Sequence, residues 1–166
     1  MKILWHVLRV PMKPNTASPS TRRIPAELDR HLAAHGAGEI TSTSVYIDRG
    51  GDLVTMDAIA GLRALRDPLH LKIRGLELGS RLRRRLEIFA WYFEEARPRS
   101  GAGDTAFREV TFALLYFLKG FDRIPDTIPE VGLLDDAMIV QFVFERHSVP
   151  LRGQALRAGR AWPVDL

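Results

Sequence analysis

Five acidic residues lie within the stretch FDRIPDTIPEVGLLDD at positions 121–136. Their carboxylates are oxygen ligands of the kind that Mg²⁺, Mn²⁺ and Ca²⁺ prefer, and a tight turn would bring several of them close to one point. The spacing does not match an EF-hand loop, and Arg108, Arg123 or Arg146 could neutralise the cluster equally well. We therefore expect no bound cofactor, with a divalent ion as the alternative. The cluster consists of Asp122, Asp126, Asp135 and Asp136, with Glu130 between them.

Two prolines in the same stretch predict a turn between two helices. Pro125 and Pro129 lack an amide donor, and each pushes the residue before it toward extended geometry. The flanking patterns predict helices over 105–119 and from about 133 to 147. Asp135 and Asp136 would then lie in the first turn of the second helix, where negative charge meets the positive end of the helix dipole.

The pattern around this turn resembles the YkvA-like family of small bacterial helical domains of unknown function. The resemblance covers roughly residues 106–146 and implies a helix pair joined by the proline turn, often in membrane-associated surroundings, with no agreed activity. Residues 119–121, Arg123 and Glu130 depart from the family pattern and make the turn more polar. The matching residues are Leu114-Leu115-Tyr116, Asp122, Ile124-Pro125-Asp126, Ile128-Pro129 and Gly132-Leu133-Leu134-Asp135-Asp136.

Basic residues are concentrated in the middle of the chain. Residues 60–86 carry a net charge of +6, whereas residues 101–147 carry −4. At the pitch of a helix, four arginines share a sector about 100° wide, which suits the phosphates of a nucleic acid or of an anionic membrane surface. A solvated helix face, or pairing with the acidic half of the chain, is the alternative. The four are Arg74, Arg81, Arg84 and Arg85.

Two further groups of residues have the composition of a site. Glu27, His31 and His35 recur at steps of four, as metal ligands on a helix do, but no glutamate follows the first histidine as in an HExxH motif. We expect them at the rim of a packed face. Trp91 points away from the expected core stripe and Phe93 belongs to it, so we expect packing or interface roles there.

Helical patterns dominate the chain and predict a mainly α fold. Helices are expected over 26–35 and 56–66, followed by one long amphipathic helix from Pro68 to about Arg97 with a single buried stripe. Residues 39–54 are rich in Thr, Val, Tyr and Ile and contain two adjacent glycines, as turns often do, which predicts a small N-terminal β-hairpin.

The length of 166 residues fits a single domain, 1–166. Within it we distinguish an N-terminal extension, an amphipathic helical region, the helix–turn–helix region and a tail. Their ranges are 1–60, 61–100, 104–148 and 149–166.

Composition restricts the function classes. The chain is 46% hydrophobic and 27% charged, as soluble globular proteins are, and it contains no cysteine, which excludes disulfides and thiolate chemistry. No window approaches the roughly 18 apolar residues of a membrane span. The first residues lack a secretory signal pattern, so we expect them in the mature protein. We expect a cytoplasmic protein, with peripheral membrane attachment open.

Three functional hypotheses follow. The first is a non-enzymatic interaction or scaffold module, because the helices over 105–119 and 133–147 are apolar nearly all round and need cover from this chain, a second copy or another protein. The second is an arginine-rich module that binds nucleic acid or an anionic membrane. The third is a divalent-metal hydrolase with the four motif aspartates as ligands.

Overall fold

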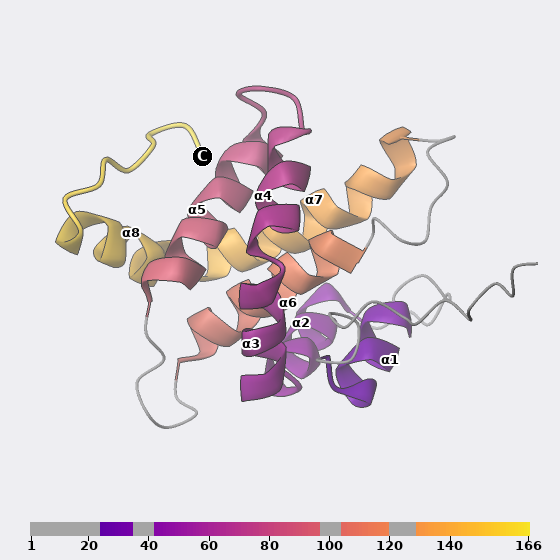
Figure 1. Ribbon diagram of the computed structural model, residues 1–166. Coiled ribbons are helices and arrows are strands. Elements are labelled where there is room, and N and C mark those ends of the chain that lie inside the picture. Colours follow the sequence, from indigo (N-terminus) through magenta and orange to yellow (C-terminus); the bar gives the residue numbers. More distant parts are fainter. Residues whose placement is uncertain (1–23, 35–41, 97–103, 120–128) are drawn as a thin grey trace, which may run out of the picture.

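The computed structural model describes residues 24–34, 42–96, 104–119 and 129–166. Within these ranges the chain forms eight helices and no strand, which confirms the mainly α fold (Figure 1). Of the N-terminal extension, 1–60, residues 1–23 and 35–41 lie outside the described residues. The helices are α1 (Ala26–Ala34), α2 (Thr43–Asp52), α3 (Met56–Ala64), α4 (Arg66–Arg74), α5 (Arg81–Glu95), α6 (Thr105–Lys119), α7 (Pro129–Arg146) and α8 (Ser148–Arg157).

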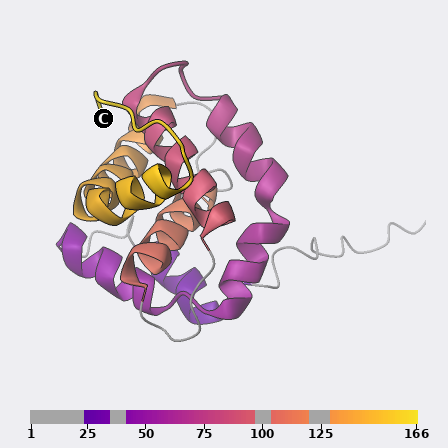
Figure 2. The same ribbon diagram turned by 90° about the vertical axis from the view of Figure 1, so that its left-hand side faces the viewer.

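Helix α6 lies at the centre of the fold. It contacts α2, α3, α4, α5 and α7, and Phe107, Phe112 and Phe117 on it are fully buried. Figure 2 shows α6 surrounded by the other helices, with α3 and α4 following one another along one side. The cover that this apolar helix requires is therefore supplied by the chain itself.

The hairpin predicted over 39–54 is wrong for residues 43–52, which form helix α2. Ser42 caps this helix by accepting a hydrogen bond from the Val45 amide, as serine does at many helix starts. Gly50 and Gly51 do not make a turn. They allow α2 to cross α6 closely, because a Cβ at Gly50 would stand 2.4 Å from the Phe112 ring. Packing against α6 thus overrides the strand propensity of the segment.

The single helix predicted from Pro68 to Arg97 is also wrong, because the chain breaks it into α4 and α5. Gly79 has a φ of 80°, a conformation that glycine adopts without strain, and Ser80 then caps α5 through the Arg83 amide. Leu71 and Leu78 of the expected stripe are exposed, whereas Leu86, Phe89 and Phe93 are buried as predicted. Helix α4 begins at Arg66, two residues before the predicted start at Pro68.

The last two helices differ from the prediction: α7 starts earlier than expected, and a further helix, α8, follows it. Helix α7 begins at Pro129, a residue well suited to a helix's first position, so Asp135 and Asp136 lie in its second turn and not in its first. The expected tail, 149–166, contains most of α8. Beyond α8, Trp162 stacks on Phe144 of α7 with ring centroids 5.6 Å apart.

A buried charge network joins α2, α6 and the end of α7. The Glu109 carboxylate is 2% exposed and accepts two hydrogen bonds from Arg146 Nη1, at 2.9 and 3.1 Å. His147 Nε2 lies 2.8 Å from Oε2 of the same Glu109 carboxylate. Arg146 also donates to Asp48 and to Ser44 on α2. Removing one member of such a network would leave a buried charge without its partner.

We predict that Gly50→Ala destabilises the protein. The added methyl group would overlap the buried Phe112 ring, so the free energy of unfolding should fall by about 1–3 kcal/mol in urea denaturation. The matched control is Gly153→Ala in α8, where the new Cβ would meet only Arg157 Nη1 at 3.6 Å. That variant should be neutral or stabilised by up to about 1 kcal/mol. Equal stabilities of the two variants would contradict the close crossing of α2 and α6.

Candidate functional site

The acidic cluster predicted from the sequence is described only in part. Asp122 and Asp126 lie outside the described residues, and nothing of the Glu130 side chain is described. Asp135 is exposed, whereas Asp136 is only 5% exposed, so these neighbours on α7 have different surroundings. The prediction that both lie in the first turn of a helix, at the positive end of its dipole, is wrong, because both lie one turn later.

Asp136 lies in an electrostatically unusual place. Burial raises the pKa of its carboxyl group to about 7; the positive charge of Lys72 opposes this shift and the negative charge of Asp135 adds to it. In the described part of the chain no hydrogen bond reaches the Asp136 carboxylate. Burial, together with the charges of Asp135 and Asp136, also raises the pKa of Tyr116 on α6. The charge of Lys72 on α4 therefore acts on this carboxylate of α7, and the carboxylate in turn acts on Tyr116 of α6.

Lys72 is the residue of this group that sequence reasoning missed. Its ammonium donates to the Phe117 carbonyl at the end of α6 and lies 4.4 Å from the centre of the Phe117 ring. Both contacts link α4 to the C-terminal end of α6. Lys72 is one basic residue among many in its segment, and no motif in the sequence distinguishes it from the others.

A metal centre is not assembled by the described residues. Among them, no three His, Asp or Glu side chains lie where they could share an ion. Arg108 and Arg146, which the sequence offered as partners of the cluster, pair with other acids: Arg108 with Asp52 at 3.9 Å, and Arg146 with Asp48 and Glu109. Metal binding through the four aspartates stays a prediction.

In the predicted histidine row on the first helix, His31 packs against Tyr46. His31 Nε2 lies 2.8 Å from the Tyr46 carbonyl, and the two rings stack with centroids 4.4 Å apart. Glu27 is exposed, and His35 lies outside the described residues. His31 therefore sits at the edge of the core, as the sequence indicated.

The four predicted anion-binding arginines do not share one face. Arg74 ends α4 and is exposed, separated from the others by the turn before α5. Arg81 is exposed and Arg84 half-buried, while Arg85 is only 8% exposed. Burial lowers the pKa of the Arg85 guanidinium, which the Glu145 charge opposes and the charges of Arg81 and Arg84 reinforce.

Arg84 and Arg85 are the members of this group that the structure brings together. The Nε atoms of both are buried without a hydrogen-bond partner, and no carboxylate lies within ion-pair distance of either in the described part of the chain. Arg84 donates weakly to the Asp165 carbonyl, at 3.5 Å. Arg85 lies over the Phe144 ring, 5.2 Å from its centroid. Buried donors without acceptors are rare and call for an explanation.

A pocket of about 180 Å³ lies beside this pair, between α5 and the segment after α8. Trp91 forms part of its wall, as the sequence-based expectation of a packing or interface role allowed. Arg160 lies over the Trp91 ring, 5.0 Å from the ring centroid. The pocket is lined by Arg84, Glu87, Ile88, Trp91, Ala155, Arg160, Ala161, Trp162 and Pro163.

A family model matches the part of the chain that contains most of α6, the acidic stretch and most of α7. Residues 109–142 match the family model described as "Protein of unknown function (DUF1232)". This agrees with the YkvA-like resemblance at the motif region. No curated protein and no solved structure matches the chain. The DUF1232 region contains Glu109, Tyr116 and Asp136, whereas Lys72, Arg84 and Arg85 lie outside it.

We predict that Asp136 makes the stability depend on pH. Its pKa is raised in the folded state above the value of about 3.9 in an unfolded chain, so the wild type should lose stability as the pH rises from about 4 to about 7. Asp136→Asn removes this loss. Relative to the wild type, the variant should gain up to about 4 kcal/mol across that range, measured by urea denaturation at several pH values.

The comparison variant is Asp135→Asn, which removes the charge of the exposed neighbour but not the burial of Asp136, so it should reduce the pH dependence much less than Asp136→Asn does. A stability difference between Asp136→Asn and the wild type that stays constant from pH 4 to pH 7 would show that Asp136 ionises as readily in the folded protein as in the unfolded chain.

Proposed function

We propose that the protein is a non-enzymatic binding module that attaches to an anionic membrane surface. The contact face consists of the first half of α5 and the segment 158–166 that follows α8. The observation that carries the proposal is the pair Arg84 and Arg85, whose Nε atoms are buried without acceptors. A lipid phosphate is an acceptor suited to the guanidinium of the half-buried Arg84, whereas Arg85, only 8% exposed, would add its positive charge to the site.

Two neighbouring arginines, Arg66 and Arg83, already have carboxylate partners. Arg66 binds Glu94 at 3.0 Å, and Arg83 binds Glu87 at 2.9 Å. Arg83 also donates to the carbonyls of Arg74 and Leu76. Arg84 and Arg85 differ from the exposed arginines of this region in that their Nε atoms are buried without an acceptor, which supports a role for them with a ligand.

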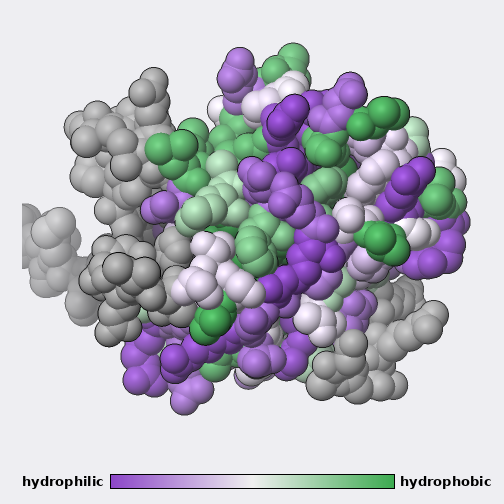
Figure 3. Space-filling model, turned by 180° about the vertical axis from the view of Figure 1, so that it is seen from behind, coloured by the Kyte–Doolittle hydropathy of each residue, from purple (hydrophilic) through white to green (hydrophobic). Residues whose placement is uncertain are grey.

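Exposed aliphatic side chains favour a membrane over a nucleic acid. Val164 is 95% exposed and lies next to Asp165, whose carbonyl accepts from Arg84. Leu78, 83% exposed, precedes α5 by three residues. Such side chains gain free energy in the acyl region of a bilayer, whereas phosphate contacts to a nucleic acid do not use them. Figure 3 shows hydrophobic residues standing among hydrophilic ones on the face seen from behind.

Attachment at the surface is the mode that fits the described helices. None of them is long and apolar enough to cross a membrane. Trp91 and Trp162 beside the arginines are suited to the headgroup region, where indole rings are enriched. The proposal thus combines a phosphate site, aromatic rings and two short aliphatic side chains.

We predict binding to phosphatidylcholine vesicles that contain phosphatidylglycerol, and little binding to phosphatidylcholine alone, in a cosedimentation assay. Binding should weaken as salt is added. The double variant Arg81→Gln, Arg84→Gln should weaken binding roughly 30-fold, since each basic residue near an anionic surface contributes about 1 kcal/mol. Val164→Ser should weaken it several-fold by removing an inserted side chain.

The charge-matched control is the double variant Arg30→Gln, Arg49→Gln. These exposed arginines are on α1 and α2, away from α8 in Figure 1, and their loss should leave binding unchanged. If both double variants weaken vesicle binding equally, the binding depends on net charge and not on the proposed contact face. If the protein binds an oligothymidylate but not vesicles, its ligand is single-stranded nucleic acid and not a membrane.

A second candidate function is association with another protein or a second copy. Thr43 of α2 contacts Met138 of α7, and both Met138 and Leu134, one turn apart on α7, are exposed. Exposed Val45 follows on α2. Leu134 and Met138 therefore form a small exposed apolar patch on α7 beside the start of α2, and apolar patches of this kind occur in interface cores.

We predict that this surface forms a dimer contact, measured by size-exclusion chromatography with light scattering. Leu134→Ser with Met138→Ser should convert a dimer to a monomer, and Val149→Ser on exposed α8 should not. A monomer at every concentration of the wild type would remove the self-association hypothesis.

A further inference from the structure

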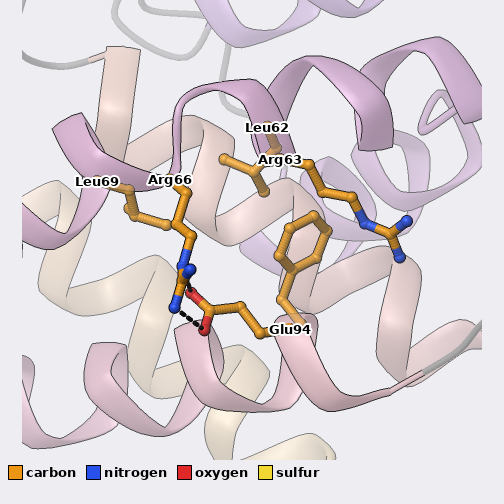
Figure 4. Close-up of a pocket in the computed structure, with 6 residues that line it drawn as sticks. Leu62, Arg63, Arg66, Leu69 and Glu94 are labelled. Atoms are coloured by element: carbon orange, nitrogen blue, oxygen red, sulfur yellow. Dashed lines mark hydrogen bonds and ion pairs between the residues drawn. The ribbon is translucent and has the colours of Figure 1, made fainter.

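A second pocket, of about 330 Å³, lies at the C-terminal end of α5 and is separate from the arginine pair. Its inner wall consists of Leu62 from α3, Leu69 from α4 and Phe93 from α5, all buried in the core. Arg63, Arg66 and Glu94 form its polar edge (Figure 4). The volume is at the lower end of the range typical of small-molecule sites.

The Glu94 carboxylate on this edge is already neutralised. Arg66 binds it with two hydrogen bonds, at 3.0 and 3.2 Å, and His70 Nε2 lies 2.6 Å from one of its oxygens. Burial acts to raise the pKa of Glu94, but the hydrogen bonds from His70 and Arg66 outweigh it, and the pKa is lowered. Figure 4 shows the Arg66 guanidinium directed at Glu94. Glu94 is thus an ionised group with fixed partners.

Arg63 is the cation on the edge that remains without an anion. Its guanidinium lies 5.9 Å from the centre of the Phe93 ring, and in the described ranges it makes no hydrogen bond and no ion pair. In Figure 4 the Arg63 side chain extends away from the Arg66–Glu94 pair. Arg63 and Arg66 against Glu94 leave one positive charge at the mouth of an apolar pocket.

We infer that this pocket binds a small amphiphilic anion, a molecule with a short apolar body and one carboxylate. The apolar body would contact Leu62, Leu69 and Phe93, where it displaces water from hydrophobic walls. The carboxylate would receive two parallel hydrogen bonds from the planar guanidinium of Arg63. The Arg66–Glu94 pair limits the site to one anionic group, because a second one would face the Glu94 carboxylate.

The charge of the site selects among ligands of similar shape. A neutral alcohol of the same length would keep the apolar contacts but lose the charge-assisted hydrogen bonds. An ammonium ion would be repelled by Arg63. Binding should therefore follow the order anion, neutral molecule, cation, an order that hydrophobic contact alone would not produce.

The test is a titration of the full chain with octanoate, octan-1-ol and octylammonium, followed by amide chemical shifts at neutral pH. Octanoate should bind saturably and shift the amides around Leu62, Leu69 and Phe93. Arg63→Gln should weaken octanoate binding about tenfold or more and leave octan-1-ol binding unchanged. Arg49→Gln removes an exposed arginine on α2 and should change neither.

Four results would overturn the inference. They are the absence of saturable shifts, shifts centred on the pocket of Trp91 and Trp162, equal affinities for octanoate and octan-1-ol, or an Arg63→Gln variant that binds octanoate as the wild type does. Because Arg63 is exposed, its substitution should not disturb folding, and the amide spectrum of the free variant checks this directly.

Discussion

The buried carboxylate of Glu109 is the constraint on which the packing of the central helices depends. A carboxylate removed from water needs partners that carry positive charge or donate hydrogen bonds, and Arg146 and His147 provide them. Both come from the point where α7 passes into α8, so neutralising Glu109 fixes the end of α7 against the middle of α6. Arg146 extends the same network to α2 through Asp48 and Ser44.

Close approach of α2 to α6 follows from the same arrangement. Gly51 brings its backbone to the Glu109 side chain, where a Cβ would stand 3.0 Å from Cγ, and Gly50 does the same at Phe112. The aromatic contacts of Tyr46 with Phe112 and Tyr116 then fill the space beside the network. The charge network and the close packing at the two glycines therefore together fix the position of α2 on α6.

Sequence reasoning predicted the helices whose signals are local. Helices were predicted over 26–35 and 105–119, and α1 and α6 form within these ranges. At the start of α6, Asp104 accepts a hydrogen bond from the Phe107 amide. Sequence reasoning failed for α2, because Gly50 and Gly51 have the same local signature in a turn as in a helix crossing. It failed again at α4 and α5, where leucine spacing predicted one stripe although Leu71 and Leu78 are exposed. Only contacts with distant residues decide these cases.

The residues of the candidate sites also differ in whether a local sequence signal or a distant contact determines their role. The basic run indicated Arg84 and Arg85, but their burial depends on Phe144 and on the segment after α8, which no local pattern connects with α5. Lys72 and Arg63 were not predicted as site residues, since their significance comes from the helix ends and pockets near them. Asp136 was predicted, yet its raised pKa depends on burial that the sequence did not indicate.

One residue, Leu65, separates α3 from α4: it ends the first helix and precedes the second. An inserted residue at this joint would turn every later position of α4 by about 100°. Leu69 and Ile73 would leave the core, and Arg66 would move away from Glu94. The turn over 75–80 is not a one-residue joint between two helices, so an insertion there need not rotate the side chains of α4 or α5. Evolutionary insertions and deletions should therefore accumulate in that turn and be selected against at Leu65.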